Sequence, residues 1–303
     1  SEENKMMYNV TKQFIEQKIL PKTDDIEKQK DGVSLNLLKE MGNLGILGIT
    51  TPEELGGLGM SFNTSMMIAD IMGIAGSIST SYGAHTGIGT LPILYYGNEE
   101  QKKKYIPGLS TGELIGCYCL TEPSAGSDAN AGKTNAHLYA DGTKYIINGQ
   151  KIWISNGGFA DIMIVFAKIG SDKNHSAFIV ESKSEGITMG PEEVKLGIKG
   201  SSTRQIFYEN VEVPVENLLG DRGQGFEIAL NILNIGRIKL CSSAIGGAKK
   251  LIEQTEEYIG ERKQFGKPIG EFGAIKQKVA KMKAKTYASE SLMYRAGQDI
   301  EDR

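Results

Sequence analysis

The stretch Cys117–Gly158, CYCLTEPSAGSDANAGKTNAHLYADGTKYIINGQKIWISNGG, predicts a β-domain built around one polar loop. Its first part, Tyr118–Thr121, is short and β-prone, and the strand must stop at Pro123 because proline has no N–H to pair. The next residues, Ser124–Asp128, are small and flexible, so their backbone amides and hydroxyls can approach a ligand closely. We therefore expect a ligand-facing loop after the first strand.

The second half of this stretch predicts a β-hairpin. Tyr145–Ile147 and Lys151–Ser155 are β-branched and aromatic, and Asn148–Gly149 between them suits the positive φ angles of a tight turn. Trp153, the only tryptophan in the chain, would then stand on one face of a sheet beside the loop that follows Thr121. On spacing alone, the preferred interpretation is an ordinary β-domain with polar surface loops and Trp153 in its core.

The segments on either side of this stretch predict helices. Ser1 caps a first helix that runs toward Ile19 and stops before Pro21, because the residue before a proline avoids helical angles. A second helix spans Ser34–Leu44, with Ser34 as its cap and one apolar face. Helical spacing of apolar residues predicts three further helices, at residues 63–74, 226–258 and from 275 to the chain end.

Further β-prone segments separated by turn signals favour a small barrel or sandwich in the middle of the chain. They are Thr134–Tyr139, Asp161–Lys168, Ser176–Glu181 and Arg204–Val213. The fold class expected is α+β, in three parts. These parts are an N-terminal all-α domain at residues 1–116, a middle β-barrel-like domain at residues 117–220 and a C-terminal helical domain at residues 221–303.

Composition excludes several classes of partner. The formal net charge is −3, with 34 basic and 37 acidic residues interspersed, so no general nucleic-acid surface is expected. No run of 18 apolar residues indicates a membrane span. The 303 residues are more than one typical domain needs and can bury a sizeable core.

Cysteine usage predicts a reducing compartment. The chain has three cysteines, an odd number, and Cys117-x-Cys119 on one strand makes neither a disulfide framework nor a zinc site. We expect all three to be reduced, buried small residues, and we expect no metal site. The sequence shows no secretory signal or transit peptide. The compartment expected is the cytoplasm in a bacterium or the mitochondrial matrix in a eukaryote.

Two segments of this chain closely resemble the flavin-binding signature of the acyl-CoA dehydrogenases. They are Tyr118–Asp128 (YCLTEPSAGSD) and Gly149–Gly157 (GQKIWISNG). The resemblance extends to PEELGGLG at residues 52–59, YGNEEQKKKY at residues 96–105 and ERKQFG at residues 261–266. Nearly the whole chain is covered, in the family's order. The small-residue run YGAHTGIG at residues 82–89 and Gly273 resemble the long- and very-long-chain branch.

The resemblance implies an FAD site and assigns residues to it. Backbone groups of Tyr118 and Leu120 and the hydroxyl of Thr121 would contact the isoalloxazine, and Trp153 would lie against it. A flavin needs such fixed hydrogen-bond donors and a flat, dry surface over its rings. The remaining positions of this group are Ile154 and Ser155 at the cofactor, and Ser127 between the flavin diphosphate and the pantetheine arm of the substrate.

A second group of cofactor positions implies an oligomer. Arg262, Gln264 and Phe265 match positions that reach the flavin of a neighbouring subunit, so the resemblance implies a homodimer or homotetramer. Arginine suits a diphosphate because its planar fork makes paired bonds to anionic oxygens, although Arg262 also fits a solvated charge at a helix end. Many relatives carry a glutamine where this chain has Gly273, which puts one diphosphate contact in doubt.

Asn234 and Arg237 correspond to positions that hold the CoA portion of the substrate. Arg237 lies within an otherwise apolar helix face, where a charge favours an anionic partner. The alternative is an arginine that extends to solvent. Without the family match the two interpretations are about equally physical.

The reaction implied is α,β-dehydrogenation of a fatty acyl-CoA to the trans-2-enoyl-CoA in fatty acid β-oxidation, with electrons passed to an electron-transfer flavoprotein. Its base must be a carboxylate with a raised pKa. In most of the family that glutamate lies beyond the point where this chain stops, and in some branches it occupies the position of Gly236. Glu122 is interpreted as a turn-stabilising acid, so no catalytic residue is assigned and the C-terminal part is expected to be incomplete.

Two rival functions remain at this point. One is another enzyme on the same scaffold, such as an acyl-CoA oxidase or a flavin monooxygenase-like member. The other is a flavin-binding assembly module without catalysis, which the glycine at position 236 keeps open.

Overall fold

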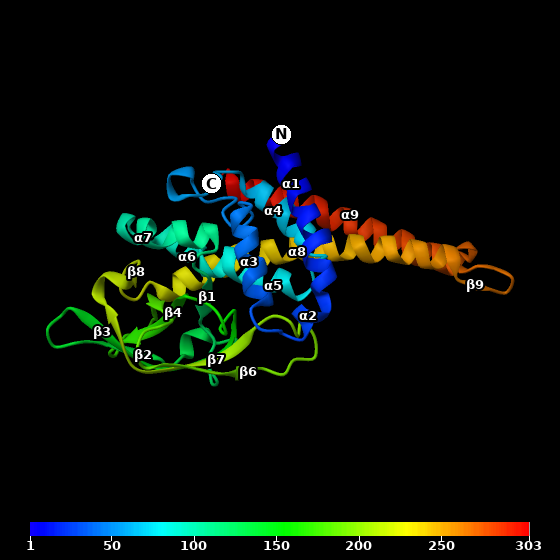
Figure 1. Cartoon of the computed structure of the whole chain (residues 1–303). Helices are drawn as coiled ribbons and strands as arrows, with labels where there is room; N and C mark the ends of the chain where they lie inside the picture. Colours follow the sequence, from blue (N-terminus) through cyan, green and yellow to red (C-terminus); the bar gives the residue numbers. More distant parts are fainter. Residues whose placement is uncertain (303) are drawn as a thin grey trace.

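The structure is a computed structural model that describes residues 1–302. It has the expected three parts: N-terminal helices, a middle sheet and C-terminal helices. Figure 1 shows the sheet on one side of the long helix α8 (Gly225–Glu261), with α9 (Gly273–Glu301) running alongside α8. The loop that joins the two long helices projects at the end of the pair that lies away from the sheet (Figure 1).

The N-terminal part is a set of short helices around one apolar cluster. The cluster includes Leu37, Leu38 and Met41, which are fully buried on one face of the second predicted helix. The α-helices are α1 (Glu2–Phe14), α2 (Thr23–Glu27), α3 (Val33–Asn43), α4 (Phe62–Met72), α5 (Ser77–Gly83), α6 (Leu91–Tyr96) and α7 (Glu99–Thr111), joined by η1 (Ile15–Ile19), η2 (Leu20–Lys22), η3 (Glu53–Leu55) and η4 (Ala84–Gly89).

Helix ends in this part differ from the sequence predictions in two places. The predicted cap at the first residue is confirmed, because the Ser1 hydroxyl accepts from the Asn4 amide at 3.2 Å. The predicted stop before Pro21 is wrong: the chain continues helically, and Pro21 lies in the first turn of η2, where a missing N–H costs nothing. Ser34 is not a cap, because α3 begins one residue earlier, after Gly32 at φ +71°.

The middle part is a mixed sheet of eight strands within residues 1–302, in the order β6-β7-β3-β2-β4-β5-β8, with β1 beside β4. Most of its pairs are antiparallel, but β1 and β2 each run parallel to β4. The strands are β1 (Gly116–Cys119), β2 (Asn135–Leu138), β3 (Lys144–Ser155), β4 (Ile162–Ile169), β5 (Ser176–Glu181), β6 (Ile187–Glu192), β7 (Thr203–Pro214) and β8 (Leu218–Leu219), with 3₁₀ turns η5 (Ala129–Ala131) and η6 (Val215–Asn217).

The predicted hairpin at Asn148–Gly149 is wrong. Strand β3 runs through this pair without turning, because it pairs with β7 on both sides of it. The Asn-Gly pair instead forms a register shift in the ladder, and Gly149 packs so closely on Thr134 that an added Cβ would lie 2.5 Å from its hydroxyl oxygen. Pairing along a twelve-residue partner strand has overridden a local turn signal.

Burial of the cysteines also differs in part from expectation. Cys117 and Cys119 are buried and unbonded on β1, with their sulfurs 3.7 Å apart, as the sequence predicted. Cys241 is exposed on α8, so the prediction that all three are buried is wrong.

Helix α8 crosses α4 at very short range. An added Cβ at Gly73 would lie 1.9 Å from the Ser243 carbonyl oxygen, and one at Gly246 would lie 1.7 Å from that of Asp70. Lys249 on α8 then forms ion pairs with Asp70 on α4 and Glu290 on α9, which ties the three helices together. By length and composition α8 could cross a membrane, but helices packed between protein elements meet the same criteria, and α8 is packed in this way.

The two long helices are joined by a two-stranded hairpin, β9 (Lys263–Gln264) and β10 (Lys267–Pro268), followed by the 3₁₀ turn η7 (Ile269–Glu271). Phe265 and Gly266 form its turn with φ angles of +52° and +79°. Positive φ at both central residues is the type I′ geometry that matches the twist of paired strands. The Phe265 ring, 92% exposed, is therefore presented at the tip.

Candidate active site

The ligand-facing loop and the Trp153 segment are joined by a direct hydrogen bond. The Ile152 amide donates to the Thr121 carbonyl at 2.9 Å, just where the ladder between β3 and β7 slips by one residue. Trp153 occupies this bulge with φ +60°, a conformation that costs a non-glycine residue about 1–3 kcal/mol. Its side chain is 56% exposed, so the interpretation that placed Trp153 in the core is wrong. Bulges of this kind re-aim a side chain beside a site.

A buried ion pair holds the loop from beneath. Lys151 Nζ contacts Glu122 Oε1 at 2.7 Å, and both side chains are almost completely buried. Lys151 also donates to the Leu120 carbonyl, while the Glu122 carboxylate accepts the amides of Lys133 and Thr134. The loop from Glu122 to Thr134 is therefore closed at both ends on one carboxylate. This agrees with the interpretation of Glu122 as a turn-stabilising acid.

Charge keeps this pair ionised despite its burial. Burial alone would raise the pKa of Glu122, but the Lys151 charge and the hydrogen bonds from Lys151, Thr134 and Lys133 hold it below its ordinary value. Burial lowers the pKa of Lys151, and Glu122 opposes that shift. No local sequence signal predicts this pair, because the two residues are far apart in the chain.

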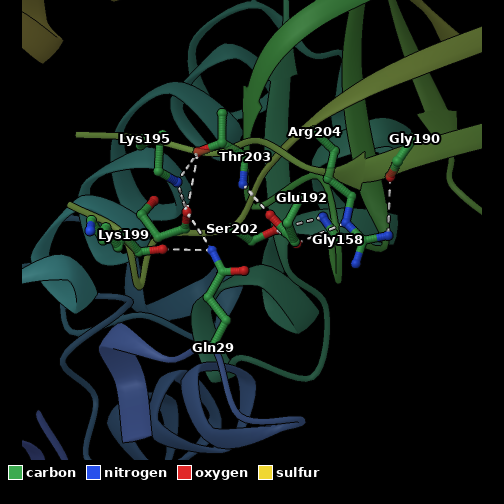
Figure 2. Close-up of polar contacts among 10 residues, drawn as sticks. Gln29, Gly158, Gly190, Glu192, Lys195, Lys199, Ser202, Thr203 and Arg204 are labelled. Carbon is green, nitrogen blue, oxygen red and sulfur yellow. Dashed lines mark hydrogen bonds and ion pairs between the residues drawn. The ribbon is translucent and has the colours of Figure 1, made fainter. Parts of the chain in front are cut away.

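The end of β3 is fixed by a second polar cluster, shown in Figure 2. The Gly158 amide donates to the Ser202 hydroxyl at 2.9 Å, and that hydroxyl donates to Glu192 at 2.7 Å. Arg204 pairs with the same carboxylate, at 2.8 Å. From the turn between α2 and α3, Gln29 donates to the Lys199 carbonyl and so joins the β6–β7 loop to the N-terminal part (Figure 2).

A mostly apolar cavity of about 280 Å³ opens beside the end of β3. Ser155 contributes the sheet side of its lining, and the rest comes from α4, α5, η4 and α8. No aspartate or glutamate of residues 1–302 lines it. The lining residues are Ala69, Ser79, Thr80, Tyr82, Gly83, Ala84, Gly87, Ile88, Ser155, Leu233, Gly236, Arg237, Lys239, Leu240 and Ser243. We call this the acyl cavity below, after the acyl group that the family resemblance implies.

The structure brings together several of the predicted site residues. Ser155, Gly236 and Arg237 line the same cavity, and Trp153 stands two residues before Ser155. The Arg237 guanidinium donates to the Asn234 side chain at 2.5 Å, and both residues are exposed on α8. The Arg237 side chain therefore lies at the solvent side of the cavity, with Asn234 beside it.

Other predicted residues are placed so that only part of each can reach a ligand. The Tyr118 hydroxyl donates to the Ala229 carbonyl on α8, and Ile154 and Leu120 are buried, which leaves their backbone groups for contact. Thr121 is half-buried and Ser127 is exposed. Ser127 lies on the loop that the ion pair closes, and Thr121 directly precedes that loop.

The hairpin residues are not brought to this site within one chain. Arg262, Gln264 and Phe265 are exposed at the tip of the α8–α9 pair, at the end away from the sheet (Figure 1). The Phe265 ring contacts the nearby Phe272 ring edge-on, with centroids 6.1 Å apart. Any contact they make with a cofactor beside β1 must come from another copy of the chain.

One buried histidine has a structural role. His85 Nε2 lies 2.8 Å from the Leu109 carbonyl oxygen, and its Nδ1 accepts the Gly116 amide at 3.0 Å. This pairing requires the proton on Nε2. Burial lowers the pKa of His85 to about 4, so the ring is neutral at physiological pH and joins α7 to β1.

Comparison with known proteins identifies the family. Three models match in order: the N-terminal domain of acyl-CoA dehydrogenase over residues 1–113, the middle domain over 117–211 and the C-terminal domain over 223–303. The chain belongs to the acyl-CoA dehydrogenase family. The resemblance of the loop and Trp153 motifs is thereby confirmed at the level of the family.

Relatives in the acyl-CoA dehydrogenase family include a probable acyl-CoA dehydrogenase of Bacillus subtilis, 50% identical over 302 residues, which are all of this chain and 51% of that protein. The rat mitochondrial very long-chain specific acyl-CoA dehydrogenase is 42% identical over 282 residues, 90% of this chain and 42% of the relative. This chain therefore spans about half the length of these two relatives.

Solved acyl-CoA dehydrogenases have the same fold. A crystal structure of an acyl-CoA dehydrogenase complexed with FAD from Bacillus anthracis superposes with a TM-score of 0.97 at 50% identity, covering all of this chain and 52% of that one. Butyryl-CoA dehydrogenase from Megasphaera elsdenii gives a TM-score of 0.93 at 34% identity, covering all of this chain and 80% of that one. The expected fold class is confirmed.

Proposed function

We propose that this chain binds FAD and a fatty acyl-CoA, and takes part in oxidising the acyl group to the trans-2-enoyl-CoA, with electrons passed to an electron-transfer flavoprotein. The observation that carries the proposal is the acyl cavity. It is apolar, it begins at Ser155 beside the exposed Trp153, and it has Arg237 at its solvent side. The apolar lining suits an acyl chain, and an arginine can bind the phosphates of the CoA to which that chain is attached.

The residues present fit a flavin. Trp153 offers an exposed aromatic face in a bulge, and the hydroxyls of Thr121, Ser127 and Ser155 lie on the segments around it. Backbone groups of Tyr118, Leu120 and Ile154 would complete the cofactor contacts. When bound, FAD supplies a two-electron acceptor. The protein's part is to hold the acyl chain in a dry cavity and to fix the loop through Glu122 and Lys151.

The base is the part of the reaction that the described lining does not supply. Gly236 has no side chain, and Glu122 is occupied by Lys151 and two backbone amides. We propose that the α-proton is removed by a carboxylate other than those that residues 1–302 contribute. The absence of an acid from this lining also favours a second candidate, a flavin-binding assembly module that does not catalyse dehydrogenation.

We propose that the working form is a homodimer or homotetramer. Arg262, Gln264 and Phe265 are exposed at a rigid hairpin tip, where a ring that is 92% exposed costs solubility unless it is covered. The side of α8 toward solvent also carries Leu240 and Leu251, exposed by 70% and 60%. A neighbouring copy would bring the hairpin to the flavin and cover these side chains.

Binding of FAD to the flavin-free chain should strongly quench its tryptophan fluorescence. Trp153 is the only tryptophan and lies where the flavin ring is proposed, so the signal reports one position. In a titration with FAD, the emission measures the quenching of Trp153 and ultrafiltration measures the amount of bound flavin.

The matched control is Trp153→Phe, which should still bind FAD, as measured by ultrafiltration, but without the emission change. Stoichiometric FAD binding that leaves the Trp153 emission unchanged would show that the ring lies elsewhere.

A further inference from the structure

The acyl cavity has a second, much smaller cavity behind its buried side. This small cavity has a volume of about 10 Å³, which is room for at most one water molecule. Two residues line both cavities, Tyr82 and Lys239, so their side chains form the wall between them. The other residues of the small cavity are Ile46, Leu47, Ile49, Thr50, Thr51, Ser65, Thr86, Thr90 and Leu91.

The two ends of the Lys239 side chain face different cavities. Lys239 is only 8% exposed, and its ammonium donates to the Thr86 hydroxyl at 3.4 Å. Thr86 lines the small cavity but not the acyl cavity. The ammonium therefore points into the small cavity, and the aliphatic stem is the part of Lys239 that faces the acyl cavity.

The small cavity is arranged to accept a cation. Three of its hydroxyls already donate their protons to backbone carbonyls: Thr86 to Tyr82, Thr90 to His85, and Ser65 to Phe62. Because each hydroxyl has only one proton, these oxygens are left with lone pairs, which act as acceptors. They can hold an ammonium directly or through one water molecule.

Lys239 has no counter-ion in the part of the chain that the structure describes. It forms no ion pair with a carboxylate of residues 1–302, and the nearby His85 ring is neutral at physiological pH. Burial lowers the pKa of Lys239 to about 8. An uncompensated buried cation is costly, and an apolar side chain of similar length would fill the space more cheaply. A functional constraint on this position accounts for that cost better than packing does.

We propose that Lys239 closes the inner end of the acyl cavity and sets the longest acyl chain that it accepts. The stem is the wall that meets the end of the acyl chain, and the ammonium anchors that wall in the hydroxyl-lined cavity. This inference rests on the proposed function, because it takes the acyl cavity as the substrate pocket. It makes Lys239 a specificity-determining residue rather than a catalytic one.

The test is the affinity of the FAD-loaded chain for a series of trans-2-enoyl-CoAs, from octenoyl- to docosenoyl-CoA. These compounds are already oxidised, so binding is measured without turnover. Isothermal titration calorimetry of the unsubstituted chain should show affinity that rises with length and then falls. For Lys239→Ala, the shortest chain that the unsubstituted protein rejects should bind about tenfold more tightly, because removing the stem admits further methylene groups.

Two further variants distinguish the loss of the cavity wall from other effects of a substitution. Lys239→Met keeps most of the stem but loses the anchoring ammonium, so its length limit should lie closer to the original than that of Lys239→Ala, and it also serves if the alanine variant is poorly folded. Leu230→Ala shortens an exposed side chain of the same helix outside the cavity and should leave the limit unchanged. Thermal melting of each variant reports folding independently of length preference.

The outcomes distinguish this inference from the proposed function. An identical length limit in Lys239→Ala and the unsubstituted chain would overturn it, as would a shift in Lys239→Met equal to that in Lys239→Ala. If the unsubstituted FAD-loaded chain binds no enoyl-CoA of any length, the proposed function fails and the inference fails with it.

Discussion

The Gly236→Glu variant is expected to lose its flavin absorbance with palmitoyl-CoA at least about 100-fold faster than the unsubstituted chain, under anaerobic conditions. A positioned base contributes about 10²–10⁴-fold to such a proton transfer. Gly236 lines the acyl cavity, where an added Cβ would meet only the Ile88 side chain, at an ordinary contact distance of 3.5 Å. The apolar surroundings would raise the pKa of the introduced carboxylate toward neutrality, which suits a general base.

Stopped-flow absorbance measures the rate of this change, and Gly236→Gln is the matched control. The glutamine has nearly the same shape and occupies the same space, but it cannot take a proton. Equal rates in the two variants would mean that the cavity does not hold the α-carbon of the thioester near position 236.

The Lys151→Met variant is expected to lose about 3–5 kcal/mol of unfolding free energy, because it leaves the Glu122 carboxylate buried without its partner. The loop from Glu122 to Thr134 depends on the same carboxylate, so flavin affinity should fall with stability. Urea unfolding followed by circular dichroism measures the first quantity. Adding Glu122→Gln to the variant should recover much of the loss, since no charge then remains buried.

Lowering the pH should reduce the difference in unfolding free energy between the unsubstituted chain and Lys151→Met. In the unsubstituted chain the pKa of Glu122 is lower in the folded state than in the unfolded state. The ionised carboxylate therefore stabilises the fold above the unfolded pKa of about 4.3, and this stabilisation is lost as the pH falls through the folded pKa. In Lys151→Met burial dominates and the folded pKa rises above the unfolded one, so protonation stabilises that variant as pH falls. A difference below about 1 kcal/mol at neutral pH, or one that widens in acid, would contradict this account of the pair.

Local sequence signals predicted those elements whose structure does not depend on pairing with a distant strand. The period of apolar residues predicted the long helices, and a β-prone run bounded by turn signals predicted β5 at Ser176–Glu181. The Asn148–Gly149 turn failed because β7 pairs along the whole of β3, which no local signal reports. Strand β6 was missed because its sequence, ITMGPE, contains a glycine and a proline.

The sequence predicted the motifs that form the site, but not the buried lysines that pack behind them. The loop after Thr121 and the Trp153 segment are adjacent, as expected, through a single backbone hydrogen bond. Lys239 could not be recognised from sequence, because a lysine three residues after Gly236 is typical of an exposed helix face. Only the packing of α8 on α4 and η4 buries it. The ion pair of Lys151 could likewise not be predicted, since its partner Glu122 lies in the loop that follows β1.

The measurement that tests the central claim most directly is an anaerobic titration of the FAD-loaded chain with palmitoyl-CoA, followed by the visible absorbance of the flavin. The claim is that the acyl cavity takes the acyl chain directly beside the flavin at Trp153 and Ser155. The account predicts a saturable change in the shape of the flavin band. A flavin band that is present and stays unchanged in excess palmitoyl-CoA would contradict it.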